Sequence, residues 1–129
     1  VLTSMHEARE DGALWHPGVM LTGVADHNAG PVWASAGLEL YPSWRDARMP
    51  FSQVHGHSSA YQWDTHAWQT DRHVARRAVV DTHARHVTFD RDGHRIVGID
   101  PQHGTSAAPV HAPLLLSDAH VLTTGDTVA

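Results

Sequence analysis

Two histidines flank one glycine in the stretch FSQVHGHSSAYQW, which covers residues 51–63. Neutral imidazole is a good ligand for Zn, Fe, Mn or Ni, and two imidazoles on a tight turn can approach one ion or two adjacent ions. A solvated turn explains the spacing equally well, because the chain holds 13 histidines among its 129 residues. His55 and His57 are therefore the first candidates for a metal site, with the solvated turn as the alternative.

A carboxylate and an imidazole two residues apart form a second pattern, since such a pair at a strand end can bind one metal together. Roughly one Asp-x-His would be expected by chance from the composition, and the chain has more than that. The occurrences include Asp64–His66, Asp81–His83, Asp92–His94 and Asp118–His120. A β-hairpin turn explains the third, and polar turn residues are the simpler explanation of the second, although it follows a predicted strand.

The elements that would position these histidines are short strands. Phe51 and Val54 predict a short buried strand that stops at Gly56, where a glycine allows a sharp turn that projects the neighbouring side chains outward. Residues 78–81, AVVD, predict another strand. Candidate ligands at the end of a strand suit an α/β scaffold, because its loops commonly carry the functional residues.

The clearest local signal is a β-hairpin over residues 86–100, HVTFDRDGHRIVGID. Val87 and Phe89 alternate with polar residues, and Asp92-Gly93 is a typical hairpin turn. The remaining segments give weaker signals. Their expected structures are an irregular helix or a strand and loop at 31–48, a loop with a short helical turn at 60–77, a loop at 101–113, and an edge strand or frayed end at 114–129.

Length and composition indicate one soluble globular domain over residues 1–129, or the C-terminal part of a larger domain. The net charge is −5 and every one of the nine basic residues is Arg, so no basic stripe supports a nucleic-acid surface. There is no Cys, which fits a reducing cytoplasm, and no apolar stretch long enough to span a membrane. Because the chain begins at Val1, we expect a processed product or part of a longer polypeptide.

The order of the motifs resembles the C-terminal half of a calcineurin-like metallophosphoesterase, in the branch of protein phosphatases and diadenosine tetraphosphatases. The resemblance covers residues 30–100. It consists of Gly30-Pro31-Val32-Trp33, the acidic Glu39, Phe51 to Ser58 with Gly56-His57-Ser58, and Val80-Asp81-Thr82 followed by the hairpin. It implies a partial α/β sandwich, made mainly of strands with a C-terminal β-hairpin and few helices.

The resemblance assigns roles to four residues. His57 would be the metal ligand of the Gly-His motif, and His6, after VLTSM, would be a second, upstream ligand. His55 would be a catalytic group that contacts the phosphate or supports the metal, and Ser58 would bind substrate. The implied cofactor is a divalent transition metal (Mn, Fe, Zn or Ni), with two ions in the intact enzyme, and the substrate is a phosphoester.

The family's N-terminal motifs, D-x-H, G-D-x-x-D and G-N-H, do not occur in order in this chain. Because they provide most ligands of a two-metal centre, the missing half would have to lie elsewhere in the same polypeptide or on a partner. The main alternative is a non-catalytic histidine-rich module that binds metals weakly or mediates an interaction. A degenerate phosphoesterase-like remnant with a structural role is the third possibility.

Overall fold

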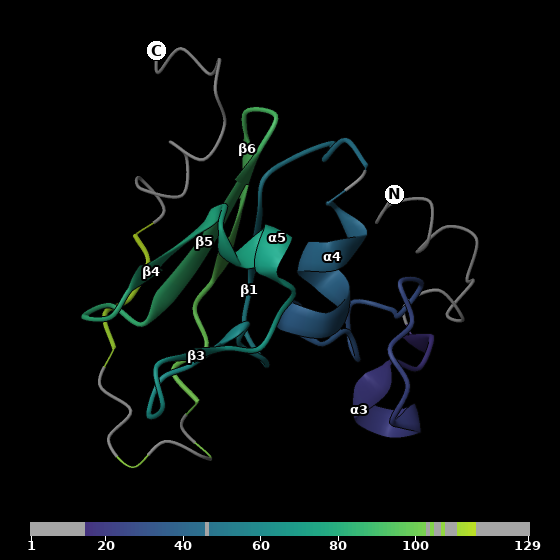
Figure 1. Ribbon diagram of the computed structural model, residues 1–129, viewed down its shortest axis with the longest axis horizontal. Coiled ribbons are helices and arrows are strands. Elements are labelled where there is room, and N and C mark those ends of the chain that lie inside the picture. The colour runs from purple at the N-terminus through teal and green to yellow at the C-terminus, as the bar shows by residue number, and fades with distance from the viewer. Residues whose placement is uncertain (1–14, 46, 103, 105–106, 108–110, 116–129) are drawn as a thin grey trace.

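A computed structural model of the chain describes residues 15–45, 47–102, 104, 107 and 111–115. Short strands dominate it, with few helices, so the protein is a mixed α/β structure (Figure 1). The elements are α3 (Val19–Thr22), the π-helix η1 (Ala36–Leu40), α4 (Tyr41–Ser43), β1 (Gln53–His55), β2 (Tyr61–Gln62), β3 (Ala67–Trp68), α5 (Arg72–Ala75), β4 (Ala78–Asp81), β5 (His86–Arg91) and β6 (His94–Gly98).

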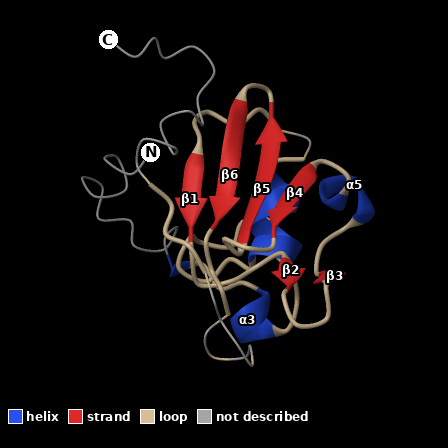
Figure 2. Ribbon diagram, turned by 90° about the vertical axis from the view of Figure 1, so that its left-hand side faces the viewer, coloured by secondary structure: helices blue, strands red, loops and turns tan. Residues whose placement is uncertain are grey.

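The main sheet has four strands in the order β1-β6-β5-β4 (Figure 2). β5 and β6 form the predicted hairpin, with Asp92 and Gly93 at φ angles of 51° and 83° in its turn. β4 pairs antiparallel with β5. β1 pairs parallel with β6, so that both strands terminate at the same end of the sheet, opposite the hairpin turn. The predicted hairpin and the strand at 78–81 are thus confirmed.

The core lies between the main sheet and the η1–α4 segment. Phe89 of β5 is fully buried and stacks on Tyr41 of α4, with ring centroids 5.7 Å apart and an interplanar angle of 15°. Ala36, Met49 and Ile96 are also fully buried in this cluster. The buried residues of β5 alternate as the hairpin pattern predicts, because successive side chains of a strand point to opposite faces, whereas Ile96, Val97 and Gly98 of β6 are all buried.

One expectation for the segments around β1 needs correction. The strand at 53–55 exists, but it is not buried: Phe51 and Val54 are each 46% exposed. β1 is the edge strand of the sheet, and the core side chains of the sheet come from β5 and β6 instead. Residues 31–48 contain a π-helix continuous with a short α-helix, where sequence periodicity left helix and strand open.

Residues 60–77 contain more order than the predicted loop. β2 and β3 pair antiparallel around Tyr61, whose ring centroid lies 5.3 Å from that of Trp63 and 5.1 Å from that of Trp68. Aromatic contacts of this kind stabilise the small hairpin beyond simple area burial. The predicted helical turn is confirmed as α5, with Asp71 as its N-cap.

The chain end is only partly described. Residues 101, 102, 104, 107 and 111–115 form no helix or strand, as predicted for 101–113 where the structure describes it. The predicted edge strand or frayed end at 114–129 falls mostly on 116–129, which lie outside the described residues, as do His6 and Asp118–His120.

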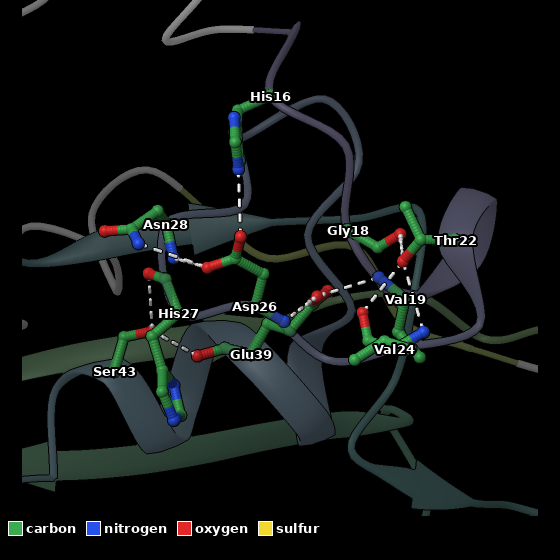
Figure 3. Close-up of polar contacts among 10 residues, drawn as sticks. All are labelled: His16, Gly18, Val19, Thr22, Val24, Asp26, His27, Asn28, Glu39 and Ser43. Carbon is green, nitrogen blue, oxygen red and sulfur yellow. Dashed lines mark hydrogen bonds and ion pairs between the residues drawn. The ribbon is translucent and has the colours of Figure 1, made fainter.

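The π-helix η1 holds the segment before it through Glu39. The Glu39 residue is 1% exposed, and its carboxylate accepts three backbone N–H bonds, two of which Figure 3 shows. The donors are Val19 and Asp26 at 2.8 and 2.9 Å from Oε1, and Ser35 at 2.7 Å from Oε2. A carboxylate can be buried at acceptable cost when its oxygens are satisfied in this way.

Candidate functional site

The Gly56–Ser58 turn follows β1 and is held in an uncommon conformation. The Ser58 N–H donates to the Gly56 carbonyl oxygen at 2.9 Å, and His57 between them has a φ of 71°. This is the geometry of the rare γ-turn that is strained for any residue other than glycine. The sequence suggested Gly56 as the residue that permits the turn, but the positive φ falls on His57.

The His57 side chain is exposed and lines two adjoining cavities at the end of the sheet where β1 and β6 terminate. The first cavity, of about 410 Å³, is also lined by His55, Gln53 and Leu40. The second, of about 490 Å³, is also lined by Ser58 and Asp100. A ligand in either space would meet the His57 imidazole.

His55 is held by protein groups on both ring nitrogens. Its Nε2 lies 3.1 Å from the Tyr41 hydroxyl, and its Nδ1 lies 3.1 Å from the Gly56 carbonyl oxygen. Burial lowers the pKa of His55, while the Gly56 carbonyl and the charge of Asp100 oppose that shift. The ring is therefore neutral near pH 7, with Nδ1–H donating to the Gly56 carbonyl oxygen and Nε2 as the acceptor nitrogen beside the Tyr41 hydroxyl.

Gly98 of β6 permits this arrangement. A Cβ atom at position 98 would lie 2.9 Å from both the His55 Nε2 and the Tyr41 Oη atoms. The Tyr41 hydroxyl also contacts the Val87 carbonyl oxygen at 3.2 Å, and burial raises the pKa of Tyr41. His55 thus belongs to a packed polar contact behind the turn, and His57 faces the cavities.

Ser58 anchors the turn to the π-helix. Its hydroxyl oxygen accepts the backbone N–H of Ala36 at 2.8 Å, which leaves the hydroxyl hydrogen available as a donor in the second cavity. Gln53 lines the first cavity with a buried Nε2 group that has no hydrogen-bond partner in the described part of the chain. Both side chains could donate to an anionic ligand beside His57.

Asp100 also lines the second cavity, although the sequence did not indicate it as a site residue. It follows β6, and because β6 runs parallel to β1, both strands terminate at the same end of the sheet. The Ile99 N–H donates to the His55 carbonyl oxygen at 2.9 Å, which extends this pairing to the residue before Asp100. An acidic residue directly after an apolar strand was the available signal, but only the parallel register connects it with His57.

The structure does not unite the Asp-x-His pairs into a metal site. Within residues 15–45, 47–102 and the described residues beyond them, no three His, Asp or Glu side chains are placed to hold one ion. His57 and Asp100 therefore offer a partial ligand set at one cavity. Imidazole and carboxylate are suitable donors for Mn, Fe or Zn, but a closed site needs more ligands.

Asp81 acts as the cap of the turn before β5. Its Oδ1 atom accepts the backbone N–H groups of His83 and Ala84, each at 2.9 Å. These bonds, that from Ala84 first, hold the pKa of Asp81 below its ordinary value. Asp81 is thus a turn residue, which agrees with the simpler interpretation of the second Asp-x-His pair.

The lowered pKa of Asp81 predicts a dependence of stability on acid. The unfolded carboxyl takes up its proton first, so the contribution of Asp81 is present above about pH 4 and is lost as the pH falls further. In thermal unfolding scans from pH 5 to pH 2.5, Asp81→Asn should lose less stability than the unsubstituted protein. A loss of stability for Asp81→Asn as steep as that of the unsubstituted protein over this pH range would contradict the assignment.

Comparison of the chain with protein-family models finds no match, and no curated protein or solved structure is similar enough to count as one. Among the described residues, no helix has the length and apolar character needed to cross a membrane. The function is therefore inferred from the residues and contacts of the site itself.

Proposed function

We propose that this chain is the C-terminal part of a metal-dependent phosphoesterase of the calcineurin-like class, with His57 as a metal ligand. The observation that carries the proposal is the strained turn that projects an exposed imidazole between two cavities. Backbone strain at a non-glycine residue is concentrated at functional sites, because the surrounding structure must maintain it at a cost.

The arrangement of the strands supports the same proposal. The Gly-His-Ser turn follows an edge strand that is parallel to β6, and the antiparallel β4–β5–β6 meander completes the sheet. Figure 2 shows η1 and α4 behind one face of this sheet. On the other face Val54 and Val79 are 46% and 62% exposed. Val97 lies between them in the same row and is 2% exposed, so only the valines of the two outer strands are open. Exposed valines at the outer strands suit one layer of a partial α/β sandwich.

The proposed cofactor is a pair of divalent transition metal ions, Mn, Fe, Zn or Ni, in the complete protein. Bound ions would polarise a phosphoester and supply an activated hydroxide. From this chain, His57 and Asp100 would ligate metal, Ser58 and Gln53 would donate hydrogen bonds to phosphate oxygens, and His55 would fix the turn from behind. The other ligands would come from the rest of the polypeptide or from a partner. The absence of cysteine favours a reducing compartment, the cytoplasm, as the location of the proposed enzyme.

The rival function is a histidine-rich metal-binding module without catalysis. The observation that favours it is the number of exposed imidazoles away from the turn, which include His66, His73 and His83. Several exposed imidazoles can bind transition metals weakly without a common geometry. In this alternative, no single histidine would dominate metal binding.

Calorimetric titration with Mn²⁺ separates the two proposals. For the complete polypeptide we expect a tight class of sites that His57→Ala removes, because an imidazole ligand is lost from a small coordination sphere. His83→Ala, which removes an exposed imidazole beyond the cavities, is the matched control and should leave the affinity unchanged. A small, similar decline for each histidine substitution would support the histidine-rich module instead.

A further inference from the structure

Arginines that are scattered in the sequence gather around one cavity at the end of the sheet opposite His57. The cavity has a volume of about 650 Å³ and is lined by Arg45, His73, Arg76, Arg77 and Arg91. Four of the nine arginines of the chain therefore line a single hollow, although the whole chain carries a net charge of −5.

Three separate segments bring these side chains together. Arg45 follows α4, Arg76 and Arg77 follow α5, and Arg91 ends β5 at the hairpin turn. Because Ala78 of β4 pairs with Phe89 of β5, the end of α5 lies beside the hairpin turn, as Figure 2 shows. β1 terminates at the opposite end of the same sheet, away from the hairpin turn. The arginine-lined cavity is therefore separate from the His57 turn.

Two of these guanidinium groups pair with carboxylates. Asp71 lies 3.5 Å from Arg45, and Asp92 lies 3.3 Å from Arg91. Arg76 and Arg77 bring two further positive charges to the same cavity. In the described part of the chain, no carboxylate pairs with Arg76 or Arg77, and both residues are exposed.

Arg91 lines the cavity although part of its guanidinium group is enclosed. Its Nε group is buried and makes no hydrogen bond of acceptable geometry within the described residues, although the Asp92 carboxylate is nearby. The side chain as a whole is 20% exposed, so its terminal nitrogens can donate to an anion in the cavity. Guanidinium groups match phosphate oxygens in pairs, which a single lysine charge cannot do.

We infer that this arginine cavity binds a compact ligand with adjacent phosphoryl groups, such as the diphosphate moiety of a small molecule. A diphosphate offers enough oxygens and negative charge for several guanidinium groups within one bounded hollow. A long polyanion is less suitable, because the net negative charge of the chain would repel the parts that extend beyond the cavity.

Calorimetric titration with inorganic pyrophosphate, in buffer containing EDTA, tests the inference without involving bound metal. We expect saturable binding that is tighter than that of orthophosphate or sulfate at equal ionic strength. Arg76→Gln and Arg77→Gln should each weaken binding by about tenfold, the loss expected for one charge-assisted contact. Arg48→Gln removes the same charge from an exposed position outside the cavity and should change the affinity less than about twofold.

Circular dichroism should show that all three glutamine variants fold, since none replaces a core side chain. His57→Ala should bind pyrophosphate normally, so failure of the proposed metal site would not affect this result. Absent binding, or an equal loss for Arg48→Gln and Arg77→Gln, would overturn the inference. Tighter binding of a short DNA oligonucleotide than of pyrophosphate would also overturn it, in favour of a nucleic-acid surface.

Discussion

Glu39→Ala is expected to lower the free energy of unfolding by about 3–5 kcal/mol, because it leaves three part-buried backbone donors without their acceptor. The Val19 and Asp26 N–H groups point at this carboxylate (Figure 3), and the Ser35 N–H group donates to its other oxygen. The loss should be measurable as a shift of the urea unfolding midpoint. It should also release the segment before η1, detectable as faster amide exchange at Val19 and Asp26.

Two further variants make this prediction specific. Glu39→Gln keeps one acceptor oxygen but directs an amide N–H₂ at a backbone donor, so its loss should be intermediate. Asp90→Ala removes an exposed carboxylate that pairs with Arg95 at 2.6 Å and should cost less than about 1 kcal/mol. A loss below about 1 kcal/mol for Glu39→Ala would show that the carboxylate does not hold this segment.

Gly37→Ala is expected to destabilise the protein by about 2–4 kcal/mol through overpacking. A Cβ atom at position 37 would collide with the Gln69 carbonyl oxygen and lie 3.2 Å from the Ala60 Cα atom. Both neighbours are backbone atoms of the β2–β3 region, so no side-chain rotation relieves the clash. Alanine favours helices more than glycine does, by about 1 kcal/mol, so without the clash the substitution should stabilise the protein. A stabilised variant would therefore contradict the described contact.

Gly56→Ala is the matched control for this substitution. A Cβ atom at position 56 meets no atom within 4 Å. The stability of Gly56→Ala should therefore stay close to that of the unsubstituted protein. Thermal unfolding of the two variants should give clearly different midpoints. Similar losses at both positions would indicate a general effect of replacing glycine instead of a clash at η1.

Local patterns predicted the hairpin well because its signals come from neighbouring residues. Val87 and Phe89 alternate on one strand, and Asp92-Gly93 adopts the positive φ angles that the turn requires. The strand at 53–55 was also predictable, but its exposure was not. Burial depends on which strand occupies the edge of the sheet, and that is decided by the parallel pairing of β1 with β6.

The parts of the site that depend on distant contacts could not be predicted from sequence. His55 and His57 are equivalent in the stretch FSQVHGH, but only the packing of Tyr41 and Gly98 holds His55 behind the turn. Asp100 joins His57 through strand register, and the arginine cavity combines three segments. A single charge in a sequence carries no information about such long-range neighbours.

Mn²⁺-dependent hydrolysis of a chromogenic phosphomonoester by the complete polypeptide is the decisive test of His57 as a metal ligand. We expect turnover that requires Mn²⁺ and that His57→Ala abolishes. His83→Ala removes an exposed imidazole outside both cavities and should retain the turnover. Circular dichroism should show that both variants remain folded. Turnover by His57→Ala equal to that of the unsubstituted protein would contradict the role of His57 as a metal ligand.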